Sequence, residues 1–151
     1  MSDESPPLVK IVIPGEPKGR KVHARAIISK KTGKPFAMAY TPTDTRNEAA
    51  VIRDGAVQAM KGEGPLTGPI DLRLKIFMSL PKTTSKKNRA MALAVPSMLR
   101  PTRKPDWDNV GKFLDQLKGI VWVDDAQVTD AHVFKRFSDQ PRLVIEVRRA
   151  C

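Results

Sequence analysis

The stretch Ile70-Asp-Leu-Arg-Leu-Lys-Ile-Phe-Met78 has the clearest structural pattern in this chain of 151 residues. Apolar residues occupy every second position, and Asp, Arg, Lys and Phe fill the positions between them. This period of two predicts a β-strand that buries one of its faces. A Gly- and Pro-rich loop over residues 62–69 precedes the strand, and Pro81 ends it.

Segments on both sides of this strand predict a small sheet covered by helices. The expected strands are residues 8–13, 120–123 (a short extended segment), 127–137 and 143–147, and residues 31–35 are the expected tip of a basic hairpin. Three helices are expected. The first covers residues 44–61, where Thr45 and Glu48 have the spacing of a capping box and Gly62 ends the helix. The second is a short basic helix at 84–94, and the third begins after Pro105 and ends at Gly119. Together they predict an α/β (α+β) fold, a single small domain over residues 1–151 with a mixed β-sheet of about four to five strands. Residues 1–7 are expected to form a flexible N-terminal tail.

The net charge of +11 indicates a polyanionic partner, most often nucleic acid. A membrane is not an expected partner, because no apolar stretch approaches the roughly 20 residues of a span and no long basic amphipathic helix is visible. The acidic start of the chain does not resemble a signal peptide, and the single Cys151 has no partner for an internal disulfide. These features favour a cytoplasmic protein. One Cys and two His argue against a structural zinc site.

The charges are distributed unevenly along the chain. Residues 17–40 and 81–105 each contain seven Lys or Arg and no acid, whereas residues 106–130 contain six Asp and only two Lys. Carboxylates repel a phosphate backbone, so an acidic cluster among basic segments is useful where divalent cations lie between carboxylate and phosphate. A solvated acidic face that happens to follow a basic loop is the alternative explanation.

The acidic segment begins with a helical pattern that can carry chemistry. On a helix, Asp108, Lys112 and Asp115 share one face, opposite the apolar stripe of Val110, Phe113, Leu114 and Leu117. Asp106 lies at the N-cap, and the extended segment before Asp124-Asp125 can fold back beside the helix start. Such a group of Asp residues predicts a Mg²⁺ site, because Mg²⁺ prefers oxygen ligands and can activate water against a phosphodiester. Each residue also has a purely structural alternative: a cap for Asp106, a helix-dipole partner for Asp108, an i+4 partner for Lys112, an exposed residue or Lys112 partner for Asp115, and a turn for Asp124-Asp125.

Aromatic residues are scarce, with five Phe, two Trp and one Tyr. Proteins that bind single strands usually stack bases on several exposed rings, so this composition favours recognition of duplex or branched backbone. We therefore expect Trp107 and Trp122 to be packing residues. His23 and His132 have no acid at a spacing that would make either of them a general base.

Several fixed spacings match one family. The residues Lys104-Pro-Asp106-Trp-Asp108-Asn109, Lys112, Asp115-Gln-Leu117 and Trp122-Val-Asp124-Asp125-Ala-Gln-Val128 together resemble the RusA family of Holliday junction resolvases. Upstream, Ile13-Pro-Gly-Glu-Pro-Lys18-Gly-Arg20 and Tyr40-Thr-Pro42 are similar to its phage and prophage branch. The resemblance covers most of the chain and is strongest over residues 104–128.

The resemblance implies a cytosolic, Mg²⁺-dependent crossover junction endodeoxyribonuclease, and the sequence leaves open whether Mn²⁺ can substitute for Mg²⁺. Such enzymes act in DNA recombination and repair as homodimers that nick two strands of a four-way junction symmetrically, and no small-molecule substrate is implied. By the same resemblance Asp106, Asp108 and Asp125 are the catalytic metal ligands, and Lys112 is the essential lysine. A two-fold dimer suits a substrate with two related strands.

The chain departs from the family pattern at three places. The connection between the helix and the acid pair is one residue shorter, which leaves Asp124 and Asp125 as alternatives, and we favour Asp125 because it directly precedes Ala-Gln-Val. Pro105 replaces a basic residue, so Arg103 or Lys104 takes over DNA contact, beside Lys18 and Arg20 in the upstream basic segment. The loop from 86 to 103 is longer than expected. A non-catalytic basic DNA- or RNA-binding module, or a phage packaging or interaction protein, is the alternative function.

Overall fold

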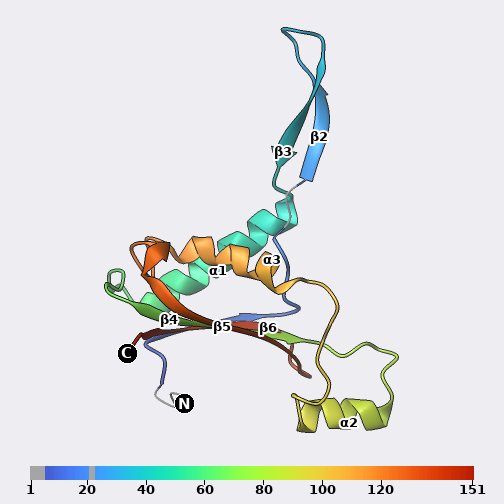
Figure 1. Ribbon diagram of the computed structural model, residues 1–151, viewed down its shortest axis with the longest axis vertical. Coiled ribbons are helices and arrows are strands. Elements are labelled where there is room, and N and C mark those ends of the chain that lie inside the picture. The colour runs from blue at the N-terminus through green and yellow to red at the C-terminus, as the bar shows by residue number, and fades with distance from the viewer. Residues whose placement is uncertain (1–5, 21–22) are drawn as a thin grey trace.

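The computed structural model describes residues 6–20 and 23–151 and builds them around one mixed sheet (Figure 1). Most of the expected N-terminal tail lies outside the described residues. The elements in chain order are β1 (Val9–Pro14), β2 (His23–Ile28), β3 (Pro35–Tyr40), α1 (Thr43–Met60), β4 (Ile70–Met78), α2 (Lys86–Ala94), α3 (Trp107–Gly111), the 3₁₀ helices η1 (Lys112–Leu117) and η2 (Asp125–Gln127), β5 (Val128–Phe137) and β6 (Arg142–Arg149).

The main sheet has the strand order β1-β6-β4-β5. Only the β4–β5 pair is parallel, and β6 runs antiparallel to both β1 and β4. The alternation in residues 70–78 is confirmed, since the apolar residues of β4 are buried and the residues between them are partly exposed. With a second, two-stranded sheet and three α-helices, the fold is the α+β single small domain that the sequence predicts.

Helices α1 and α3 lie over one face of the sheet (Figure 1). Ile52 and Ala56 of α1 are fully buried in the core, and Gly55 allows a close approach, because a Cβ there would lie 3.1 Å from Ile11 of β1. The predicted capping box at the start of this helix is wrong. The helix begins earlier, after Pro42, so Thr45 and Glu48 are buried inside its first turns.

The segment after β4 forms the crossover that a parallel strand pair requires. The predicted continuous helix is a single α-helical turn, α3, that tightens into the 3₁₀ helix η1. Its apolar stripe is nevertheless buried as expected, with Val110, Phe113 and Leu117 in the core. Gly119, with φ of +82°, ends the crossover helix where predicted. Helix α2 packs separately, through Ala92, on Leu80 and Phe137.

Strands β2 and β3 form a hairpin that projects from the body near the start of α1 (Figure 1). The predicted turn is confirmed, with Ser29 N–H donating to the carbonyl of Lys34 and Gly33 in a left-handed conformation. Every residue of β3 is exposed. No helix among the described residues is long and apolar enough to span a membrane.

Candidate active site and nucleic-acid interface

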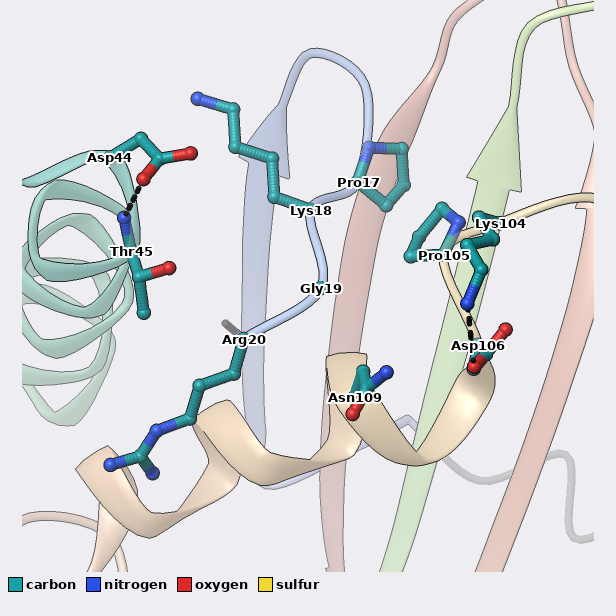
Figure 2. Close-up of a pocket in the computed structure, with 10 residues that line it drawn as sticks. All are labelled: Pro17, Lys18, Gly19, Arg20, Asp44, Thr45, Lys104, Pro105, Asp106 and Asn109. Carbon is teal, nitrogen blue, oxygen red and sulfur yellow. Dashed lines mark hydrogen bonds and ion pairs between the residues drawn. The ribbon is translucent and has the colours of Figure 1, made fainter. Parts of the chain in front are cut away.

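A pocket of about 400 Å³ lies between three segments that are distant in sequence (Figure 2). The segment after β1 contributes Pro17 to Arg20, the start of α1 contributes Asp44 and Thr45, and the start of α3 contributes Lys104, Pro105, Asp106 and Asn109. Three of the four predicted DNA contacts therefore line the same pocket as one predicted metal ligand: Lys18, Arg20, Lys104 and Asp106.

Close backbone packing holds the upstream segment against α3. The N–H of Arg20 donates to the carbonyl of Asn109 at 2.8 Å, and a Cβ on Gly19 would lie 3.2 Å from Cβ atoms of both Asn109 and Pro105. The guanidinium of Arg20 points away from the pocket and binds Asp115 and the carbonyl of Lys112. Lys18 approaches Glu48 of α1 at 3.8 Å with most of its length exposed. Arg20 thus orders the pocket wall, while Lys18 and Lys104 offer exposed positive charge.

The two carboxylates at the start of α3 are accessible. Asp106 occupies the N-cap position as predicted, but its side chain makes no capping hydrogen bond and instead faces Lys104 at 3.3 Å. Asp108 lies 4.0 Å from Lys112, whose Nζ also donates to Asn109. The side chains of Asp106 and Asp108 are 51% and 54% exposed. Asp106 therefore stands at the N-cap without capping the helix through its side chain, and its carboxylate stays accessible to a further partner.

Sequence analysis missed Lys135, which fixes the loop before α3. From β5 its Nζ donates to the carbonyl of Arg103 at 2.6 Å and to that of Pro105 at 2.9 Å. Burial lowers the pKa of Lys135, nearby Asp106 raises it, and Arg103 adds to the lowering. Arg103 itself donates to the carbonyl of Ser79, just beyond β4. The sequence signal that could have found it is the alternation of β5, in which Lys135 shares one face of the strand with the apolar Val133 and Phe137.

The acid pair before β5 has a different environment. The buried indole of Trp122 donates to Asp125 at 2.8 Å, whereas Asp124 caps η2 in a capping box with Gln127. Gln127 in turn donates to the carbonyls of Leu66 and Gly68, which precede β4. Asp124 is therefore committed to local structure, and Asp125 is the better candidate for a ligand.

The structure places Asp125 and Asp106 at opposite ends of β4. The loop of Asp106 is tied to Ser79 after this strand, and the turn of Asp125 is tied to Leu66 and Gly68 before it. Lys135, which bonds the carbonyl of Pro105, pairs with Ile76, whereas Val128, which follows the turn of Asp125, pairs with Ile70, and at about 3.3 Å per residue these two levels of the sheet lie about 20 Å apart. The expectation that the acid pair folds back beside the helix start is wrong, because a parallel β5 must begin where β4 begins.

A single chain therefore does not gather the expected three-carboxylate metal site. Within residues 6–20 and 23–151, no group of three His, Cys, Asp or Glu side chains is close enough together to hold an ion. The accessible carboxylates of Asp106 and Asp108 are oxygen groups of the kind that Mg²⁺ prefers, and Mg²⁺ sites in proteins often consist of one or two carboxylates completed by water and substrate phosphate.

Exposed carboxylates beside a cationic pocket, on a small mixed-sheet scaffold, are suited to a protein that acts on phosphodiester backbones. Comparison with known proteins makes the assignment specific: residues 14–148 match the model of the endodeoxyribonuclease RusA family. The chain belongs to this family, which makes it a nuclease of the Holliday junction resolvase type with DNA as its substrate. It is also similar to the uncharacterized protein YqaN of Bacillus subtilis (strain 168), with 31% identity over 129 residues, 77% of this chain and 91% of that protein.

Proposed function

We propose that the protein is a structure-selective endonuclease that resolves four-way DNA junctions by paired symmetric nicks. The reaction is Mg²⁺-dependent phosphodiester hydrolysis, with Mn²⁺ as a substitute, and it serves DNA recombination and repair in the cytoplasm. The observation that carries this proposal is the accessible carboxylate of Asp106 in a pocket that also presents Lys18 and Lys104, with the accessible Asp108 two residues further on in α3.

Each group has a role that its chemistry supports. Asp106 and Asp108, at the start of α3, would hold the metal ion, which when bound would supply charge neutralisation on the phosphate and activation of a water. Lys112, 4.0 Å from Asp108, is close enough to stabilise a phosphate oxygen in the transition state. Lys18 and Lys104 hold the strand backbone, which positions one phosphodiester against the carboxylates. Lys135 keeps the carboxylate loop in place.

The protein acts as a homodimer, and the placement of Asp125 supports this part of the proposal. Asp125 lies at the far end of β4 from Asp106, so it can complete a metal site only from another chain. We infer that Asp106 and Asp108 of one protomer meet the partner subunit's Asp125. Two such sites related by a two-fold axis would face two related strands of a junction.

The test uses purified protein, a synthetic four-way junction and a linear duplex with the same arm sequences. Wild type with Mg²⁺ should nick the junction at paired positions and leave the duplex intact, and EDTA should abolish cleavage. Asp106→Asn should bind the junction as tightly as wild type, or more tightly because a charge that repels phosphate is lost, and should not cleave it. Salt-dependent binding without any product would instead indicate a non-catalytic DNA-binding module or a packaging protein.

A further inference from the structure

A second groove lies on the other side of the carboxylate loop. Its wall is the edge strand β5, through Ala131, Val133 and Phe134, and its opposite side is Trp107 with the loop of Arg100 and Pro101. Because the free edge of the sheet borders it, this groove opens to solvent along its length. The role proposed above does not use these residues.

Trp107 is the unusual member of this groove. It was expected to pack in the core, as Trp122 does at 1% exposure, but it is 59% exposed. An indole carries one of the largest apolar surfaces of any side chain, and leaving it in water forfeits a favourable burial. Trp107 is also the first residue of α3, directly between Asp106 and Asp108, and successive helical residues point about 100° apart. The ring therefore faces a different direction from the two carboxylates while sharing their helical turn.

Two guanidinium groups give the groove its charge. Arg136 lies 4.8 Å from the ring of Phe134 and donates to a backbone carbonyl, and Arg100 donates to the backbone carbonyl of Ser97. None of the ion pairs found between described residues involves either of them. Burial lowers the pKa of Arg136, and the positive charge of Arg100 lowers it further. Two cations that line one groove, and that form no ion pair within the described part of the chain, are suited to an anion.

The segment that carries Trp107 is also held in place by hydrogen bonds. Lys135 lines the groove and donates to the carbonyls of Arg103 and Pro105. Those bonds anchor the residues immediately before Trp107, so little conformational freedom remains to be lost when a planar ligand stacks on the ring.

We propose that this groove binds one unpaired nucleotide of the strand to be cut, with its base stacked on Trp107 and its phosphates at Arg100 and Arg136. This inference rests on the proposed nuclease function and deepens it. Because one helical turn carries both the indole and the carboxylates, the stacked base belongs to a nucleotide next to the phosphodiester at Asp106. Unstacking a base costs least where it is already unpaired. The groove therefore favours the branch point of a junction over continuous duplex.

Tryptophan fluorescence tests the proposal without cleavage. In EDTA, saturating four-way junction should quench the exposed component of the emission and protect it from acrylamide, while matched linear duplex should have little effect. Trp107→Phe should lose this signal yet keep most of the affinity for the junction. Trp107→Leu, which keeps apolar bulk but no ring, should bind the junction about 5- to 30-fold more weakly and the duplex nearly as wild type. Val57→Ala, at an exposed apolar position on α1, is the control.

Arg100→Gln and Arg136→Gln add a second measurement. Each should flatten the slope of log K against log salt for junction binding by the amount that corresponds to about one lost phosphate contact. Unchanged acrylamide access to Trp107 in the complex, or wild-type affinity of Trp107→Leu, would overturn the proposal. Equal losses of affinity for duplex and junction would also overturn it. A change in Trp107 emission with protein concentration alone would overturn it too, because it would mean that a second copy of the chain covers the groove. Because all readouts are binding, they remain decisive if wild type cuts no DNA.

Discussion

The ammonium of Lys135 donates a hydrogen bond of 2.9 Å to the carbonyl oxygen of Pro105, thirty residues earlier in the chain. Together with its bond to the carbonyl of Arg103, this contact ties the edge strand β5 to the loop that carries Asp106 and Trp107. One side chain on the sheet thus supports both the carboxylate pocket and the neighbouring groove.

Replacing this lysine should impair catalysis more than DNA binding. Lys135→Met removes both hydrogen bonds, and a shift of the loop by about 1 Å can cost on the order of 100-fold in rate. We expect kcat for junction cleavage to fall at least tenfold, with Kd within about threefold of wild type. Lys135→Arg, which can still donate to both carbonyls, should recover part of the rate. A Lys135→Met enzyme with full kcat would show that the loop holds its position unaided.

Mixing two inactive variants should reveal whether the metal site is shared between subunits. Asp106→Asn and Asp125→Asn should each be inactive alone. In a mixed dimer of the two, one site carries both substitutions and the other carries neither, so the 1:1 mixture should regain single-strand nicking. Mixing Asp106→Asn with Asp108→Asn is the matched control and should stay inactive, because these residues belong to one helix. If the first mixture also fails while wild type cleaves, the three acids do not assemble across subunits.

The tip of the β2–β3 hairpin should contribute electrostatic contacts to DNA. Lys30 and Lys34 are exposed on an arm that projects from the body. Lys30→Gln/Lys34→Gln should flatten the slope of log K against log salt by up to about 1.8, the value for two lost phosphate contacts. Lys10→Gln/Lys61→Gln removes the same charge from the body and should alter the slope less. Equal slopes for the two double variants would exclude a specific role for the hairpin.

The buried Glu146 on β6 should make the protein lose stability in acid. Burial raises the pKa of Glu146, but hydrogen bonds from Lys75 at 2.6 Å and Arg148 at 3.0 Å outweigh this, so the pKa lies below its usual value. A depressed carboxyl pKa stabilises the fold above the unfolded pKa of about 4.3, and this stability is lost as pH falls through the folded value.

Glu146→Gln should therefore lower the free energy of unfolding by about 3 kcal/mol at pH 7, because it leaves two cations without their carboxylate. Its stability should also decrease less than that of wild type between pH 5 and the acid range. Urea denaturation at several pH values measures both effects, with the exposed Asp54→Asn as control. Parallel pH curves for wild type and Glu146→Gln would contradict the assignment.

Local sequence patterns were sufficient to predict most helices and strands and to indicate the protein family. The alternation in β4, the stripe of Val110, Phe113 and Leu117, and the stop at Gly119 are local consequences of burial and backbone freedom, and all are confirmed. The helix expected over residues 44–61 is confirmed to within one residue, and only its capping box is wrong, because the spacing of Thr45 and Glu48 occurs inside a helix as readily as at its start.

The sequence by itself determined the α+β fold, the basic and acidic segments and the accessible carboxylates at the start of α3, because these follow from periodicity, charge and helix geometry. Only the tertiary structure decided that Asp125 and Asp106 lie toward opposite ends of β4, that Lys135 supports the loop before α3, and that Trp107 faces solvent. The physical reason is the parallel pairing of β4 and β5, which is a long-range contact. It forces the chain back to the start of β4 and so separates Asp106 from Asp125, which belong to the same acidic segment of the sequence.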